Sequence, residues 1–138
     1  MKVKKSLIGY LSGLFILITF PGCDDIVDAG LNEEFFISPG QKAVIENTGL
    51  EIAFIRVLED SRCPRGVECV WEGNGRVEIS LNYRGSGNEF RELNTALDPK
   101  LTQIRNFRIS LAQLQPYPEY GNEILPENYR ISLIVTEE

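Results

Sequence analysis

Apolar and polar positions alternate along several short segments of the chain. Residues 76–83 alternate without a break, and residues 107–111 and 129–133 repeat the pattern. A period of two predicts β-strands that bury one face and leave the other in solvent. Residues 51–58 are apolar at both parities, which predicts a central strand covered on both faces.

Turn-forming residues separate these segments. Ser38-Pro39-Gly40, Asn47-Thr48-Gly49, Asn74-Gly75 and residues 84–88 all tolerate turn dihedrals at low cost. Short strands separated by such turns are typical of a sandwich or a barrel. About seven strands are expected, at residues 34–38, 41–46, 51–58, 76–84, 88–95, 105–114 and 128–136.

Two segments lack the strand pattern. Residues 94–104 are the only place where a helical turn is expected. Residues 115–127 contain three prolines and should form a long loop between the last two strands. The fold class predicted is therefore all-β, an antiparallel β-sandwich, with the immunoglobulin fold as one candidate.

The N-terminus has the layout of an export signal. Lys2, Lys4 and Lys5 precede a mostly apolar run at residues 7–20. As a helix this run would extend roughly 21 Å, short of the ~30 Å hydrocarbon core of a bilayer. A signal peptide over residues 1–22 therefore fits better than a membrane-spanning helix.

The sequence Thr19-Phe20-Pro21-Gly22-Cys23 resembles a lipobox, the cleavage motif of bacterial lipoproteins. The resemblance implies cleavage before Cys23 and acylation of that residue, which would anchor the chain stably in a membrane. Phe20 and Pro21 depart from the usual Leu and small residue. The alternative is that Cys23 is simply a third cysteine after an ordinary signal. Lipidation is favoured because it leaves Cys63 and Cys69 to pair, with no odd thiol.

Residues 23–32 are expected to form an acidic tether to a sandwich domain at residues 33–138. Asp24, Asp25 and Asp28 crowd the anchor. Acidic residues after a lipidated cysteine resemble sorting signals, which imply inner-membrane retention in some bacteria and surface export in others. A solvated linker is the plain alternative. The location expected is the bacterial cell envelope, with the outer membrane or cell surface favoured.

The chain is acidic, which limits the classes of partner that it is expected to bind. Its formal net charge is −6, and loss of the leader would leave 11 basic against 20 acidic residues, a net charge of −9. Such a surface repels phosphate backbones, so no nucleic-acid partner is expected. The expected partners are the membrane, through the lipid, and an envelope protein or glycan.

The most specific internal motif runs from residue 59 to residue 74. Cys63 and Cys69, in an exported chain, predict a disulfide that closes a small loop. Chain entropy makes such a bond worth about 2 kcal/mol. The CxxxxxC spacing differs from redox CxxC motifs, so a redox role is not favoured. The only tryptophan, Trp71, follows two residues after Cys69 and could pack against the bridge or cap the core.

Asp60-Ser61-Arg62-Cys63-Pro64 followed by Cys69-Val70-Trp71-Glu72-Gly73 resembles a family of bacterial envelope lipoproteins of uncharacterised function with a D-S-R-C-P…C-x-W-x-G motif. Leu114-Gln115-Pro116-Tyr117-Pro118 resembles a second element of that family. The resemblance implies a small β domain, often lipid-anchored, and it implies no known activity.

Two interpretations of the motif remain. Asp60, Arg62 and Trp71, with Tyr117 from the proline-rich loop, could form a binding site on a rigid loop. Alternatively, Asp60 and Arg62 form a structural ion pair or bond the loop backbone, and Trp71 lies in the core. Tyr117 and Tyr120 could likewise serve recognition or pack over one end of the sandwich. The structural interpretations are favoured.

No catalytic or metal site is expected. The chain has no histidine, which removes Ser-His-Asp catalysis and the commonest metal ligand. No phosphate-binding motif, zinc-ligand spacing or calcium-loop spacing is present, so no cofactor is expected. The function expected is a lipid-anchored, non-catalytic β-sandwich with a binding or structural role. A carboxylate-dependent envelope hydrolase and a protease inhibitor that inserts the Cys63–Cys69 loop are the alternatives.

Overall fold

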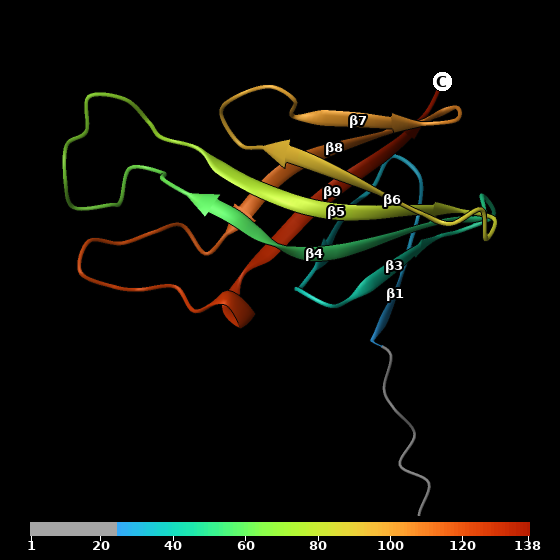
Figure 1. Cartoon of the computed structure of the whole chain (residues 1–138), viewed down its shortest axis with the longest axis horizontal. Coiled ribbons are helices and arrows are strands. Elements are labelled where there is room, and N and C mark those ends of the chain that lie inside the picture. Colours follow the sequence, from blue (N-terminus) through green and yellow to red (C-terminus); the bar gives the residue numbers. More distant parts are fainter. Residues whose placement is uncertain (1–24) are drawn as a thin grey trace, which may run out of the picture.

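Nine strands and one short 3-10 helix make up the computed structural model, which describes residues 25–138 (Figure 1). The strands are β1 (Ile26–Ala29), β2 (Glu34–Ile37), β3 (Lys42–Ile45), β4 (Leu50–Asp60), β5 (Gly75–Tyr83), β6 (Asn88–Asn94), β7 (Leu101–Ile104), β8 (Phe107–Gln115) and β9 (Arg130–Glu137), and the helix is η1 (Pro126–Asn128).

The strands form two sheets that pack face to face. The first sheet has the order β1-β3-β4-β5-β6, in which β3 to β6 follow one another as an antiparallel meander and β1 joins β3 in parallel. The second sheet has the order β2-β9-β8-β7 and is antiparallel throughout. This architecture confirms the predicted all-β sandwich.

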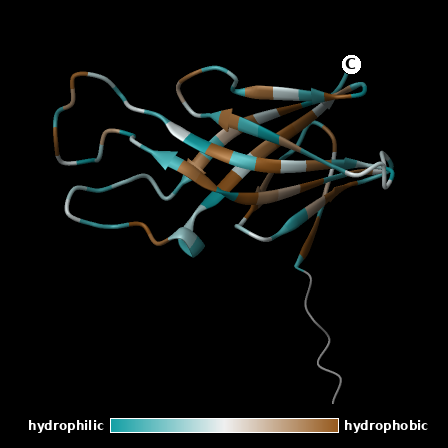
Figure 2. Ribbon diagram, viewed as in Figure 1, coloured by the Kyte–Doolittle hydropathy of each residue, from teal (hydrophilic) through white to brown (hydrophobic). Residues whose placement is uncertain are grey.

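The alternation read from the sequence accounts for the core. Val77, Ile79 and Leu81 of β5 are fully buried, and Ile131 and Leu133 of β9 are fully buried in the other sheet. Figure 2 shows the same alternation of hydrophobic and hydrophilic positions along the strands. Burial of these side chains at about 25 cal/mol per Å² of apolar surface is what holds the two sheets together.

The prediction for β4, a central strand covered on both faces, is half right. The strand is central, between β3 and β5, but only one of its faces is buried. Ile52 and Phe54 are fully buried, whereas Ala53 is half-buried and Ile55 is exposed. The register of β4 against β5 shifts between Phe54 and Arg56 and again between Val57 and Glu59. Such bulges change which side chains face the core, so the apolar residues of both parities do not imply two covered faces.

Three further expectations differ from the structure. β1 and β7 were not expected, because each has only four residues and neither shows a clear alternation. β1 lies inside residues 23–32, so part of the segment expected to be a tether belongs to the first sheet. Residues 94–104 contain β7 and turns, and no helical turn.

The strand order also differs from the immunoglobulin arrangement. Immunoglobulin sheets pair strands that are not consecutive, such as B with E. Here four consecutive strands, β3 to β6, lie side by side in one sheet. The structure is therefore a sandwich in which each sheet contains a meander, β3 to β6 in one and β7 to β9 in the other.

Candidate functional site

Two long connections meet at one end of the sandwich. Residues 61–74 join β4 to β5, and residues 116–129 join β8 to β9 through η1. The Arg65 amide donates to the Pro118 carbonyl at 3.0 Å, and the Tyr120 amide donates to the Arg65 carbonyl at 3.0 Å. We call this end of the molecule, residues 61–74 and 116–129, the loop end (Figure 1, left).

A buried ion pair holds the base of the loop end. Arg62 donates from Nε to Asp60 Oδ1 and from Nη2 to Asp60 Oδ2, both at 2.7 Å. The same guanidinium donates to the carbonyls of Leu114 at 2.5 Å and Pro116 at 2.9 Å. Arg62 therefore connects the end of β4 with the end of β8, and its planar fork satisfies four acceptor atoms at once.

These contacts also protect an open sheet edge. β7 pairs only with β8 residues from Phe107 to Ser110, so the later part of β8 has no neighbouring strand on that side. Unpaired edges invite intermolecular strand pairing, and natural proteins blunt them with charged side chains. Arg62 occupies two carbonyls of this uncovered stretch, at Leu114 and Pro116. The structural ion pair expected for Asp60 and Arg62 is confirmed. The backbone that the Arg62 side chain bonds is that of Leu114 and Pro116, and not that of the disulfide loop.

The protonation of Asp60 follows from this environment. Burial alone would raise the pKa of Asp60, but the hydrogen bonds and positive charge of Arg62 outweigh it and lower the pKa below its usual value. The Tyr129 hydroxyl donates to Asp60 Oδ2 at 3.0 Å. Burial and this bond to a carboxylate raise the pKa of Tyr129 to about 12. Asp60 is thus held as a carboxylate whose two oxygens are both engaged.

Asn74 and Gly73 fix the other side of the base. The Asn74 side chain donates to Asn94 Oδ1 at 2.8 Å and accepts from the amides of Ala96 and Leu97 at 3.1 and 3.3 Å. Gly73 has φ +75°, and a Cβ there would lie 1.9 Å from the Ser61 carbonyl oxygen. Only glycine fits this position, because the two arms of the loop approach closely there.

The Cys63–Cys69 disulfide is present as predicted. The Cys63 amide donates to the Glu72 carbonyl at 2.8 Å, which closes the loop just below the bridge. Beyond this point the chain leaves the two sheets, so no core is available to its side chains. The expectation that Trp71 lies in the core is wrong: Trp71 is 52% exposed and Val70 is fully exposed.

The two tyrosines of the second connection have different environments. The ring of Tyr117 lies 5.1 Å from the Arg62 guanidinium carbon and 5.3 Å from that of Arg65. Cation–π contact of this kind holds the ring against the base of the loop. Tyr120 is 74% exposed. Tyr117 is itself 40% exposed and packs on the two arginines, so the expectation of packing over the sandwich end holds only in part for Tyr117 and is wrong for Tyr120.

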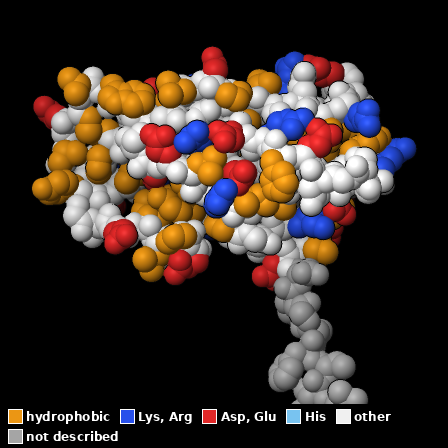
Figure 3. Space-filling model, viewed as in Figure 1, with side chains coloured by type: hydrophobic (Ala, Val, Ile, Leu, Met, Phe, Trp, Pro, Cys, Tyr) orange, Lys and Arg blue, Asp and Glu red, His pale blue; other side chains and the backbone are white. Residues whose placement is uncertain are grey.

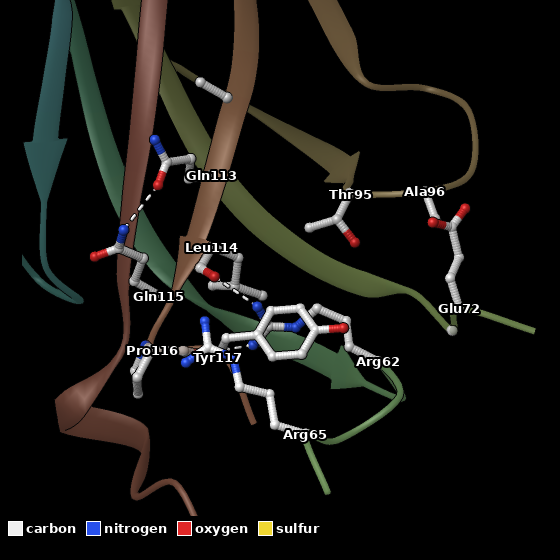
Figure 4. Close-up of a pocket in the computed structure, with 12 residues that line it drawn as sticks. Arg62, Arg65, Glu72, Thr95, Ala96, Gln113, Leu114, Gln115, Pro116 and Tyr117 are labelled. Carbon is white, nitrogen blue, oxygen red and sulfur yellow. Dashed lines mark hydrogen bonds between the residues drawn. The ribbon is translucent and has the colours of Figure 1, made fainter. Parts of the chain in front are cut away.

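An open groove of about 530 Å³ lies beside these residues. In Figure 4, Tyr117, Arg62 and Arg65 gather on one side of the groove, and Glu72 and Thr95 lie on the other. Residues 112–115, at the end of β8, also line the groove, and Gln113, Leu114 and Gln115 lie on the side away from Glu72 in Figure 4. Figure 3 shows hydrophobic side chains gathered over the loop end as a whole.

The structure does not describe residues 1–24, and two of the predicted features fall there. The signal peptide at residues 1–22 and the lipidation of Cys23 lie outside the described residues. Within residues 25–138, no cluster of three or more potential ligands could hold a metal ion. None of the helical structure in that range is long and apolar enough to cross a membrane.

Comparison with known proteins adds no assignment. No protein-family model matches the sequence, and neither curated proteins nor solved structures give a significant match.

The sequence interpretation named Asp60, Arg62, Trp71 and Tyr117 as a candidate binding loop, and the structure does bring these residues to one end. It also separates these residues into a buried pair and an exposed pair. Asp60 and Arg62 are buried at the base, whereas Trp71 and part of Tyr117 face solvent. Val70 was not identified as a site residue, and a single valine in a loop carries no sequence signal of full exposure.

Proposed function

We propose that the chain is a lipid-anchored, non-catalytic protein of the bacterial cell envelope, whose loop end recognises another envelope component. In this proposal a lipid on Cys23 holds the domain on a membrane, with the outer membrane or the cell surface favoured. Exposed side chains of the loop end then make the contact.

The observation that carries the proposal is the difference between the base and the tip of the disulfide loop. The base is fixed by the buried Arg62 guanidinium, by Gly73 and by the Cys63–Cys69 bridge. The tip places Val70 and Trp71 in solvent. Rigid presentation of apolar side chains lowers the entropy lost on binding, which favours a recognition role. Grouped exposed apolar residues commonly mark interaction surfaces.

The position of β1 fits an anchor at Cys23. β1 begins at Ile26, three residues after Cys23. Three residues span at most about 10 Å, so a lipid at Cys23 would keep the domain close to the bilayer. Ile26 is also 55% exposed at the start of this strand.

The contacts of Asp60 also favour a binding role over a hydrolytic one. A groove beside β4 is lined by Glu59, Asp60 and Glu127. A hydrolase would need two of these carboxylates free to act as acid and base. Both oxygens of Asp60 are engaged by Arg62 and Tyr129, and Glu59 forms an ion pair with Arg76 at 3.9 Å. Among the described residues, Glu127 is then the one carboxylate of this groove without an ion-pair partner, which does not provide the pair that a hydrolase needs.

Two measurements test the proposal. Mass spectrometry of the mature protein should find an acylated Cys23 at the N-terminus, and a free thiol there would contradict the anchor. A photo-cross-linking amino acid at position 70 should join the protein to a partner in membranes of the producing cell. The same probe at Ser86, in the β5–β6 turn at the opposite end, should not. Equal yields at both positions would contradict a recognition role for the loop end.

A further inference from the structure

We infer that the partner of the loop end is a protein surface with an apolar pocket surrounded by basic side chains. This inference rests on the proposed function and specifies the chemistry of the partner. Two properties of the described residues lead to it: the apolar side chains at the tip and the charge around them.

The tip supplies a set of apolar side chains suited to a pocket. Val70 is fully exposed, Trp71 is 52% exposed and Val67 is 39% exposed, all within or next to the disulfide-closed loop. Tyr120, 74% exposed, belongs to the connection that is hydrogen-bonded to the same loop at Arg65. Tryptophan and tyrosine are the residues that most often dominate binding energy when a partner buries them. A projecting loop with such side chains fits a concave partner.

The charge around the tip is negative and unbalanced. Five carboxylates of the two connections are exposed, and none of them forms an ion pair with a lysine or arginine of residues 25–138; they are Glu68, Glu72, Glu119, Glu123 and Glu127. The two cations of the loop end offset little of this charge. Arg62 is paired with the buried Asp60, and the exposed Arg65 supplies a single positive charge against the five carboxylates.

The carboxylates of the sheets are arranged differently. Glu51 pairs with Lys42, Glu78 pairs with Arg56, and Arg76 reaches Glu92. On the sheets, much of the negative charge is therefore neutralised within the chain. At the loop end it is available to a partner, and complementary potentials steer association and fix the choice of partner.

The negative charge of the loop end also argues against two other partners, a lipid bilayer and a second copy of this chain. An anionic bilayer surface would be repelled by the acidic rim, even though its interior could accept Trp71. A second copy of this chain would have to present a basic surface. The opposite end offers Arg84 and Arg105, which both lie over the ring of Tyr83, but Glu46 and Glu137 line the same hollow as Arg84. A basic protein partner fits both properties.

The test uses the full-length, membrane-bound protein with a photo-cross-linking amino acid at position 70. Cross-linking is measured in membranes at 50 and 500 mM KCl. It is then repeated in a Glu68→Lys, Glu72→Lys variant. The matched control is Glu33→Lys, Glu46→Lys, which makes the same change in net charge on exposed residues away from the loop end. Thermal unfolding of each purified variant confirms that it is folded.

We expect the protein adduct to fall about tenfold in high salt and in the Glu68→Lys, Glu72→Lys variant, because charge complementarity acts mainly on association. The control variant should keep the adduct. Peptide mapping of the adduct should place the cross-link in a lysine- or arginine-rich segment of the partner.

An adduct that resists both salt and the charge reversal would overturn the inference while leaving the recognition role intact. So would an adduct to lipid, or to a second copy of this chain. Absence of any adduct at position 70 would instead contradict the proposed function itself, so the two failures are distinguishable.

Discussion

The two ends of the sandwich are built in different ways. At the end opposite the loop end, residues 46–49, 84–87 and 105–106 make tight turns between neighbouring strands. Gly49 and Gly85 have positive φ there, and the Ser86 amide bonds back to the Tyr83 carbonyl three residues earlier. We call this the turn end. Its geometry is set by residues within the turns themselves.

The loop end depends on contacts between distant parts of the chain. Arg62 bonds to carbonyls 52 and 54 residues away, and Asn74 bonds to the amides of residues 22 and 23 positions later. Long connections normally lie over the surface with few such contacts. The difference indicates that the loop end keeps a defined shape, which the proposed recognition role requires. Substitutions at the loop end, compared with control substitutions elsewhere in the domain, can test this conclusion.

The largest effect is expected for Arg62→Ala. Removal of the guanidinium leaves the Asp60 carboxylate buried without its cation and frees the Leu114 and Pro116 carbonyls. Breaking a buried pair costs about 3–5 kcal/mol, measured as the free energy of unfolding in urea. Arg84→Ala at the turn end, where Arg84 is exposed over Tyr83, should change that free energy by less than about 0.5 kcal/mol. Similar losses for both variants would contradict the difference between the ends.

Gly73→Ala and Gly85→Ala form a matched pair of glycine substitutions. The two residues have almost the same φ, +75° and +72°. A Cβ on Gly73 would clash with backbone, whereas a Cβ on Gly85 meets nothing within 4 Å. We expect about 1 kcal/mol for Gly85→Ala from backbone strain alone. For Gly73→Ala we expect about 3 kcal/mol, because the loop arms must also separate. Equal unfolding free energies would show that the close approach at Gly73 is unimportant.

The disulfide is expected to contribute less than Arg62. Replacing Cys63 and Cys69 by alanine should lower the free energy of unfolding by about 2 kcal/mol, as for a loop of this size. The sandwich should remain folded, with its far-ultraviolet circular dichroism unchanged, because the base is still held by Arg62. A fully unfolded double variant would show that the bridge, and not the buried ion pair, holds the loop end.

Low pH should lower the stability of the loop end, because it protonates Asp60. Its pKa in the folded protein lies below the usual value of 3.8, so its stabilising contribution is complete above that value and is lost as the pH falls through the lower folded pKa. The stability difference between wild type and Asp60→Asn should therefore shrink below about pH 4. Urea titrations at pH 7, 5 and 3 measure this stability difference. A difference that is the same at all three pH values would contradict the assigned role of the carboxylate.

The smallest effect on stability is expected for Val70→Ser combined with Trp71→Ser. Both side chains face solvent, so the free energy of unfolding should change by less than about 0.5 kcal/mol. A control at the core, Ile79→Val, should cost about 1 kcal/mol. A large loss in the double variant would mean that these residues serve folding rather than recognition.

The same difference between the ends explains how much could be predicted from the sequence. Two of the three turns of the turn end were predicted, because Asn47-Thr48-Gly49 and residues 84–88 carry local turn signals between alternating strands. The turn at residues 105–106 was not, since it falls at the start of the strand expected at residues 105–114. Seven of the nine strands were expected close to their observed positions. β1 and β7 were not, because a strand of four residues is too short to show its period.

The loop end was predicted only in part. The Cys63–Cys69 pairing and the Asp60–Arg62 ion pair follow from residues close together in the sequence. The bonds from Arg62 to Leu114 and Pro116 could not be predicted, since nothing local to either segment specifies the other. The exposure of Trp71 was missed for a related reason. Tryptophan is a highly buried residue type on average, and the exposure of Trp71 here depends on where the loop leaves the sheets.

The most direct test of the central claim measures folding and contact on the same variant. With the cross-linking residue placed at Tyr120, the Val70→Ser, Trp71→Ser variant should unfold at the same urea concentration as the parent protein but lose most of its adduct in membranes. An adduct that persists in the folded double variant would contradict the claim that the exposed tip of the disulfide loop is a recognition surface.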